Sequence, residues 1–216
     1  MDNNDKEKFL EALLKGDRKG GSAIAKKYVE SHSDIKNFYE NIIKPSLYKV
    51  GEMWEYNIIS VAAEHLATAV SESIMNELYE HVISENRSPY KIVLGCIEKE
   101  QHQVGVKMIA DVFEMHGWDA FFLGANTPNA DFIDYIREIE PDLIGLSLSI
   151  YSHMPSFEEL IKNVRNEFPN KPIIVGGQAF THGGEELIRA HYNIILLRNL
   201  SETEQYIKHF EDEHKR

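Results

Sequence analysis

The sequence predicts an α/β protein in which an N-terminal four-helix bundle, residues 1–86, precedes a doubly wound parallel five-stranded sheet, residues 87–216. Three observations lead to this prediction. From about residue 5 to residue 86, apolar residues recur at helical spacing and no alternating strand pattern is present. A short polar stretch, Ser84 to Pro89, then changes the composition. From Tyr90 onward, short apolar runs alternate with helical segments, as in a parallel sheet covered by helices.

Four apolar stripes predict the helices of the bundle. Gly20-Gly21-Ser22 is expected to break the chain between the first and second helices. Asp34 is expected to cap the third helix, in which Pro45 either produces a kink or starts a new helix. A break at Glu55-Tyr56-Asn57 leads into the fourth and longest helix. Helices with such stripes can bury them against one another.

In the C-terminal part, strands and helices are expected to alternate as in a Rossmann-like (flavodoxin-like) domain. The predicted strands are residues 91–97, 119–123, 142–148, 172–176 and 193–197. The predicted helices are residues 103–116, 129–139, 155–168, 184–191 and 201–213. In such a sheet the loops after strands one, three and four should lie side by side, where ligands usually bind.

Composition narrows the possible partners of the chain. The 216 residues carry a formal charge of -12 without any Lys/Arg-rich block, so direct binding to nucleic acid is not expected. The lone Cys96 lies in an apolar strand, excludes an internal disulfide and is expected to be a buried thiol. No apolar run approaches the roughly 20 residues that span a bilayer. A cytoplasmic protein without a membrane contact is the resulting expectation.

Three short motifs fall in the loops that should lie side by side. Glu100-Gln101-His102-Gln103-Val104-Gly105 follows the first strand, Ser147-Leu148-Ser149 ends the third, and Gly176-Gly177 ends the fourth. Between Gly105 and Ser147 lie 41 residues (106 to 146), and between Ser149 and Gly176 lie 26 (150 to 175). A glycine pair alone is equally consistent with an ordinary turn. The three motifs together predict a binding site.

These motifs resemble the cobalamin-binding domain shared by methionine synthase, the mutases and corrinoid proteins, whose pattern is Asp-x-His-x-x-Gly, then Ser-x-Leu, then Gly-Gly. The resemblance covers residues 90 to about 213. Two positions depart from the pattern. Glu100 replaces the aspartate, and Ser149 stands where leucine is usual.

The resemblance implies that cobalamin is bound with its own base displaced and that His102 is the lower axial ligand of the cobalt. Glu100 would hold the other ring N–H of His102 and so set its tautomer and basicity. Gly105 would leave room for the displaced nucleotide tail. The remaining cofactor-binding residues implied are Ser147, which would hydrogen-bond the base region, together with Ser149, Gly176 and Gly177.

The helical part contains a second pattern. Trp54 is followed by nine residues (55 to 63) and then by Glu64-His65. This resembles the four-helix cap of the CarH-type B12 photoreceptors, in which a Trp-x9-Glu-His motif covers the upper face of adenosylcobalamin. By resemblance, Trp54 packs over the upper ligand, Glu64 accepts hydrogen bonds from the ribose hydroxyls, and His65 lines the same pocket. The corrin would then be bound between the bundle and the sheet domain.

Two features of the family pattern are missing from this chain. The CarH-type regulators carry an N-terminal helix-turn-helix DNA-binding domain, whereas this sequence starts directly with the predicted bundle. Their light-exposed form recruits a histidine immediately after the tryptophan as an upper cobalt ligand, and here that position is Glu55. His65 or a water molecule would have to serve instead.

The other histidines are not spaced as metal ligands and are interpreted as surface residues; they are His32, His81, His116, His153, His182, His191, His209 and His214. His182-Gly183-Gly184 follows the fourth strand and is a further candidate for the edge of the nucleotide pocket. Asn126-Thr127-Pro128 resembles a helix-entry turn that borders the corrin.

The sequence therefore favours a cobalamin-binding sensory or regulatory module that responds to light or to the cofactor, with adenosylcobalamin favoured over methylcobalamin. No catalytic residue is assigned. The alternative is a corrinoid shuttle protein of a methyltransferase system, which is catalytic only with partner proteins. A plain cobalamin carrier is a third possibility. A homo-oligomer, or a signalling or methyltransferase partner protein, is expected in either of the first two cases.

Overall fold

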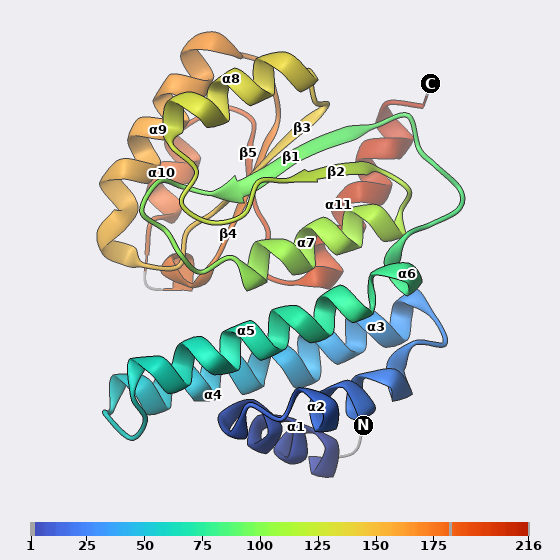
Figure 1. Cartoon of the computed structure of the whole chain (residues 1–216). Helices are drawn as coiled ribbons and strands as arrows, with labels where there is room; N and C mark the ends of the chain where they lie inside the picture. Colours follow the sequence, from blue (N-terminus) through green and yellow to red (C-terminus); the bar gives the residue numbers. More distant parts are fainter. Residues whose placement is uncertain (1–2, 182, 216) are drawn as a thin grey trace. The chain divides into compact units, whose positions relative to one another are not determined.

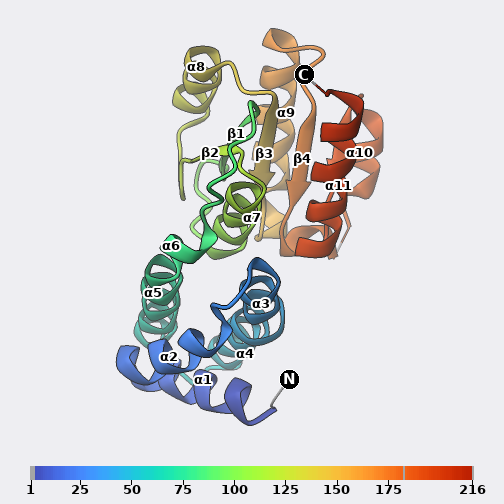
Figure 2. The ribbon, with the colours of Figure 1, turned by 90° about the vertical axis from the view of Figure 1, so that its right-hand side faces the viewer.

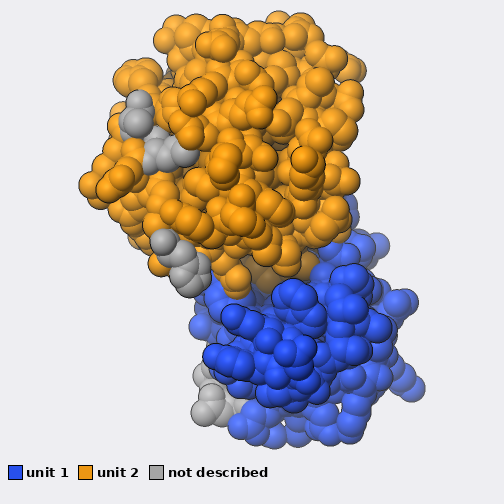
Figure 3. All heavy atoms as spheres, turned by 90° about the vertical axis from the view of Figure 1, so that its left-hand side faces the viewer, with its two compact units in different colours: residues 1–83 blue, residues 84–216 orange. Residues whose placement is uncertain are grey.

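The computed structural model describes residues 3–181 and 183–215. The chain divides into two compact units, residues 1–83 and residues 84–216 (Figure 3). The division falls between residues 83 and 84, whereas the composition of the sequence placed it between residues 86 and 87.

Among its described residues, the first unit consists of helices joined by short turns, with no strand (Figure 1). Its helices are α1 (Asn3–Lys15), α2 (Arg18–Ala25), η1 (Lys26–Tyr28), α3 (His32–Phe38), η2 (Tyr39–Ile43), α4 (Lys44–Glu55), α5 (Val61–Glu77) and α6 (Tyr79–Val82). Their apolar stripes meet in a core that contains the fully buried rings of Phe9, Phe38 and Tyr39. No helix in the described ranges 3–181 and 183–215 has both the length and the apolar character needed to cross a membrane.

The expected break at Gly20-Gly21-Ser22 is wrong, because α2 runs through all three residues. Asp17 begins this helix, and its side chain accepts a hydrogen bond from the backbone N–H of Gly20. A Cβ atom on Gly21 would lie 2.6 Å from Cδ1 of Ile74 in α5. Glycine at this position therefore serves close packing of two helices rather than a turn.

The start of the third helix also differs from the expectation. Ser31, and not Asp34, is the N-cap of α3, because its hydroxyl accepts a hydrogen bond from the backbone N–H of Asp34. Further along, Pro45 lies in the first turn of α4, directly after the π-helical turn η2. The wider turn, in which Lys44 N–H donates to the carbonyl of Tyr39, lets the helix continue past a residue that lacks an N–H.

The second unit is a five-stranded parallel sheet in the order β2-β1-β3-β4-β5. Its strands are β1 (Lys91–Cys96), β2 (Asp119–Phe122), β3 (Leu143–Ser147), β4 (Ile173–Gly176) and β5 (Ile194–Leu196). Its helices are α7 (Val104–Met115), α8 (Asn129–Ile139), η3 (Tyr151–His153), α9 (Met154–Glu167), η4 (Gln178–Thr181), α10 (Glu185–Ala190) and α11 (Leu200–Glu213). The structure thus confirms the doubly wound Rossmann-like fold.

Helices cover both faces of this sheet, with α7 and α11 on one face and α8, α9 and α10 on the other (Figure 2). On the first face the indole of Trp118 is fully buried among aromatic rings, and its Nε1 donates to Glu211 in α11 at 2.7 Å. On the second face, apolar residues of β1, β3 and β4 pack against Phe132, Phe157 and Ile188. Because both faces of the sheet are buried, the strand sequences are continuous apolar runs without polar alternation.

Candidate functional site

The carboxyl ends of β1, β3 and β4 lie next to one another, as the sequence predicts. Ser147, the last residue of β3, pairs with Cys96 at the end of β1 on one side and with Gly176 at the end of β4 on the other. The loops that leave these three strands carry the Glu100-x-His102, Ser147-x-Ser149 and Gly176-Gly177 motifs. Parallel strands place such loops at one edge of the sheet, where they can contact the same ligand.

The carboxylate of Glu100 joins two of these loops. It is fully buried, and its Oε1 accepts a hydrogen bond from the backbone N–H of His102 at 3.1 Å and lies 2.5 Å from Nδ1 of the same residue. Its Oε2 accepts the backbone N–H groups of Ser149 and Ile150, both at 3.0 Å. Burial raises the pKa of Glu100, but the hydrogen bonds from His102, Ile150 and Ser149 outweigh it and lower the pKa to about 2.

Hydrogen bonds of its backbone also hold the loop that carries His102 in place. Lys99 adopts a left-handed conformation with a φ of 71°, and its N–H donates to Oδ1 of Asn126 at 2.8 Å. The N–H of Asn126 in turn donates to the carbonyl of Glu100 at 2.8 Å, and the thiol of Cys96 lies 3.5 Å from the carbonyl of His102. A strained backbone beside a candidate ligand, held by neighbours on both sides, is common in preorganised sites.

His102 presents its ring at this edge of the sheet. Because Nδ1 faces Glu100, Nε2 is the nitrogen that a metal would use, and 52% of the side chain is exposed. Across the described ranges 3–181 and 183–215, no three His, Cys, Asp or Glu side chains are grouped to hold an ion together. A single imidazole suits a metal that brings its other ligands with it, as cobalt does in a corrin.

The glycines of the motifs have different structural roles. A Cβ atom on Gly105 would point into open space, with no atom within 4 Å. By contrast, Gly177 has a φ of 112°, and a Cβ there would lie 2.1 Å from the carbonyl oxygen of Leu148. A Cβ on Gly176 would lie 3.0 Å from the carbonyl oxygen of Leu197. The fold itself therefore requires glycine at position 177, whereas Gly105 leaves space that a bound group can occupy.

The predicted cap residues lie at one end of the bundle. Trp54 belongs to the last turn of α4, Glu64 and His65 to the first turns of α5, and residues 56–60 connect the two helices. The Trp54 side chain is 47% exposed rather than part of the bundle core. Glu64 accepts a hydrogen bond from the Thr68 hydroxyl at 3.0 Å, and its Oε2 lies 3.6 Å from Nε2 of His65. An exposed indole of this kind is a surface on which a ligand can pack.

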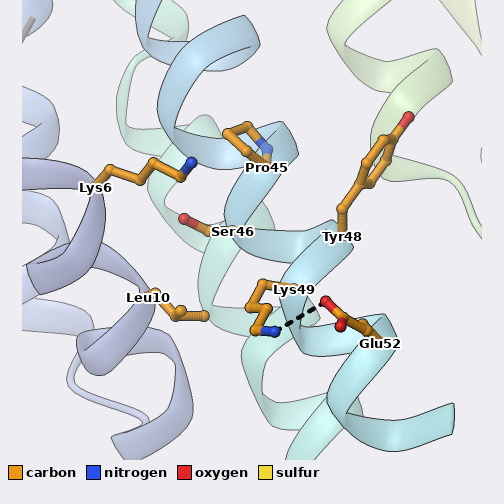
Figure 4. Close-up of a pocket in the computed structure, with 7 residues that line it drawn as sticks. All are labelled: Lys6, Leu10, Pro45, Ser46, Tyr48, Lys49 and Glu52. Carbon is orange, nitrogen blue, oxygen red and sulfur yellow. Dashed lines mark hydrogen bonds and ion pairs between the residues drawn. The ribbon is translucent and has the colours of Figure 1, made fainter. Parts of the chain in front are cut away.

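A cavity of about 290 Å³ elsewhere in the bundle contains none of these cap residues (Figure 4). It lies between α1 and α4, and its lining residues are Lys6, Leu10, Pro45, Ser46, Tyr48, Lys49 and Glu52. Lys49 forms an ion pair at 2.9 Å with Glu52, three residues further along α4. We assign no role to this cavity.

Sequence reasoning missed two features of the site. The first is the role of Ser149, which acts through its backbone N–H on Glu100. The second is His153, interpreted as a surface residue, whose buried Nδ1 lies 3.7 Å from Oε2 of Glu100. Its position in the loop after β3 was the signal that could have found it. His116 is likewise partly buried, 3.4 Å from Glu204, and not a surface residue, whereas His182 lies outside the described residues.

Two family models match the chain, both described as B12 binding domain. One covers residues 90–198, which is the sheet unit with its three motifs, and the other covers residues 6–79 of the helical unit. The first match alone spans half of the chain. The chain belongs to the B12 binding domain family. As a member of that family it binds cobalamin.

Individual relatives of this B12-binding chain fall into two groups. It is 28% identical over 176 residues to the HTH-type transcriptional repressor CarH of Myxococcus xanthus, covering 81% of this chain and 58% of the repressor. It is 25% identical over 183 residues to a corrinoid protein of Desulfitobacterium hafniense, covering 79% of this chain and 82% of that protein. The chain thus spans little more than half the length of the repressor.

A solved structure shows the same fold. The monomethylamine corrinoid protein of Methanosarcina barkeri matches with a TM-score of 0.80 at 13% sequence identity, covering 97% of this B12-binding chain and 100% of that one. At this level of identity the match establishes a helical bundle with a Rossmann-like domain.

Proposed function

We propose that this chain binds cobalamin with His102 as the lower axial ligand of the cobalt and acts as a sensory or regulatory module. The observation that carries the proposal is the Glu100–His102 pair, in which a buried carboxylate orients a half-exposed imidazole at the ligand-binding edge of the sheet. Metal-bound histidines commonly depend on such a carboxylate partner. The glutamate is one methylene longer than the family's aspartate, yet it still reaches the ring.

The other motif residues fit the nucleotide tail of the cofactor. The open space beside Gly105 would receive the tail along the start of α7. Ser147 would hydrogen-bond the base region, while Ser149 contributes its backbone N–H to Glu100. Gly176 and Gly177 keep side chains away from this edge of the sheet. These residues bind and orient the cofactor, and none of them is assigned a catalytic role.

The helical unit would determine what the cofactor is used for. Trp54 would pack on the upper ligand, Glu64 would accept hydrogen bonds from sugar hydroxyls, and His65 would line the same pocket. This arrangement favours adenosylcobalamin, whose cobalt–carbon bond light can break. Loss of the adenosyl group would leave Trp54 and Glu64 without their ligand, so that the bundle shifts and alters an oligomer or a partner contact. Without a histidine at Glu55, His65 or water would complete the illuminated state.

The second candidate function is that of a corrinoid shuttle protein in a methyltransferase system. The match to the D. hafniense corrinoid protein favours it, because the chain spans 82% of that protein but only 58% of the CarH repressor. In this role the exposed Trp54 would make no contact with the upper ligand, and methylcobalamin would bind as well as adenosylcobalamin.

Titration of the protein with adenosylcobalamin and with methylcobalamin, in the dark and after illumination, distinguishes the two functions. For the sensory module, we expect Trp54→Ala to weaken the binding of adenosylcobalamin roughly 5-fold and that of methylcobalamin little, because an aromatic contact typically contributes about 1 kcal/mol. Tyr79→Ala, which removes a similarly exposed ring at the start of α6, is the matched control. If both cofactors bind Trp54→Ala as they bind the unmodified protein, and light leaves the spectrum unchanged, the sensory function is excluded.

A further inference from the structure

The loop after β3 carries an imidazole that the proposed ligation does not use. His153 ends the turn η3 and occupies the N-cap position of α9, where 30% of its side chain is exposed. Its Nδ1 is buried and has no hydrogen-bond partner among the residues that the structure describes. This nitrogen lies 3.7 Å from Oε2 of Glu100. A second histidine therefore faces the carboxylate that orients His102.

The contact with Glu100 favours a proton on Nδ1 of His153. A bare Nδ1 would direct its lone pair at an ionised carboxylate in a buried setting, which is repulsive. An Nδ1–H group in the same place is attracted to the oxygen. A shift of about 0.7 Å would bring the two atoms to ordinary hydrogen-bond distance. The ring thus stands ready to donate to Glu100 without any change of the fold.

Such a donor would compete with His102 for the same carboxylate. Oε2 of Glu100 already accepts the N–H groups of Ser149 and Ile150, while Oε1 serves His102. A third donor on Oε2 withdraws negative charge from the whole carboxylate and weakens its bond to Nδ1 of His102. Because that bond makes the imidazole a better ligand, the basicity of its Nε2 toward a metal falls.

We infer that His153 is a positioning residue for the lower ligand: it shares Glu100 with His102 and thereby limits how strongly His102 ligates cobalt. The inference rests on the proposed ligation by His102. His153 lies outside the three motifs, in the loop after β3, and from there it would tune the strength of the lower ligand.

Cobinamide, a corrin without a nucleotide base, tests the inference, because any nitrogen ligand in its spectrum then comes from the protein. Its dissociation constant and absorbance spectrum are measured with the full chain and with His153→Phe, which keeps a ring but removes both nitrogens. We expect His153→Phe to bind roughly 3- to 10-fold more tightly, somewhat less than the usual effect of a direct partner of a metal ligand. His153→Asn, which keeps an N–H near the position of Nδ1, should stay within about twofold of the unmodified protein.

Two further variants complete the test. His116→Phe changes another partly buried histidine with a carboxylate neighbour, at the opposite end of α7 from His102, and should leave binding unchanged. If His153→Phe does not fold, His153→Leu replaces it, with the same expected gain in affinity. Circular dichroism of the cofactor-free proteins checks folding.

Comparison of His102→Ala with the His153 variants distinguishes failure of the proposed ligation from failure of the role inferred for His153. His102→Ala should abolish the nitrogen-ligated spectrum; if it does not, the proposed ligation fails and the inference fails with it. If His102→Ala abolishes the spectrum but the donor-free His153 variant binds cobinamide no more tightly than the unmodified protein, the inference is overturned and the proposed function stands.

Discussion

Glu100 joins the loop that follows β1 to the loop that follows β3, and the structure stabilises its ionised form. Three backbone N–H groups and the ring of His102 surround its two oxygens. The folded protein therefore favours the charged carboxylate although the side chain is fully buried. A residue of this kind links the stability of the chain to pH.

Acid should reveal that linkage. The pKa of Glu100 is lowered from its ordinary 4.5 to about 2, so between these values the unfolded chain binds the proton first. Stability from the ionised carboxylate, about 3 kcal/mol, is fully present above about pH 4.5 and is lost as pH falls toward 2. In urea unfolding of the cofactor-free protein, Glu100→Gln should be less stable at pH 7, and the difference should shrink by pH 3. Glu138→Gln makes the same change on an exposed side chain and is the control. A stability difference for Glu100→Gln that stays constant over this range would contradict the interpretation.

Cys96 provides a second test at the same scale. Burial, aided by the nearby charge of Glu100, raises the pKa of its thiol to about 12. We expect iodoacetamide at pH 8 to leave the folded protein unmodified and to add a single group to the urea-unfolded chain, measured by mass spectrometry. Equal labelling rates in the two states would show that the thiol is accessible and that β1 is less well packed than described.

At the scale of the elements, the glycines allow the fold and the ligand to be tested separately. Gly105 lies in the first turn of α7, where a methyl group would meet no atom of the protein. Gly105→Ala should therefore leave the stability of the cofactor-free protein unchanged or raise it by up to about 1 kcal/mol. The same variant should bind cobalamin more weakly, because the methyl group occupies space proposed for the nucleotide tail. Unchanged affinity would place the tail elsewhere.

Gly177 should behave in the opposite way. Its positive φ and the contact with the carbonyl of Leu148 leave no room for a side chain. Gly177→Ala should cost at least about 2 kcal/mol of the free energy of unfolding, measured by urea denaturation without cofactor. If the cost is under half of that, the loop after β4 can relax and its glycine pair is not required by the backbone.

Most helices and strands could be predicted from the sequence because each is marked by a hydrophobic pattern within its own residues. The five strands are apolar runs bounded by polar residues, and the structure places each within about two residues of its predicted range. The sequence-based predictions were wrong where the role of a residue depends on a contact with a residue far away in the chain. Gly21 looks like a helix breaker, but it lies inside α2 because Ile74 packs against it. His153 looks like a surface residue until the fold brings it to Glu100.

At the scale of the whole molecule, each unit contributes one part of the proposed function. The sheet unit, residues 84–216, carries the proposed lower-ligand site, and the bundle unit, residues 1–83, carries Trp54, Glu64 and His65. The three-motif pattern allowed the family to be predicted from sequence, and the family matches confirm it. The choice between a sensory module and a methyl shuttle depends on the upper ligand. The motifs of the sheet unit concern the lower ligand and the nucleotide tail, so they do not predict which upper ligand is bound.

The central claim is that His102 ligates the cobalt of a bound cobalamin, and an absorbance spectrum tests it most directly. Purified protein and His102→Ala are each mixed in the dark with methylcobinamide, which lacks the nucleotide base, and separated from unbound cofactor. We expect the unmodified protein to retain the corrin with the spectrum of a nitrogen-ligated cobalt. His102→Ala should retain it with the spectrum of free methylcobinamide, or bind it at least roughly 10-fold more weakly, because loss of a carboxylate partner of a metal-bound histidine alone typically costs about 10- to 100-fold in affinity. An identical nitrogen-ligated spectrum in both proteins would contradict the claim.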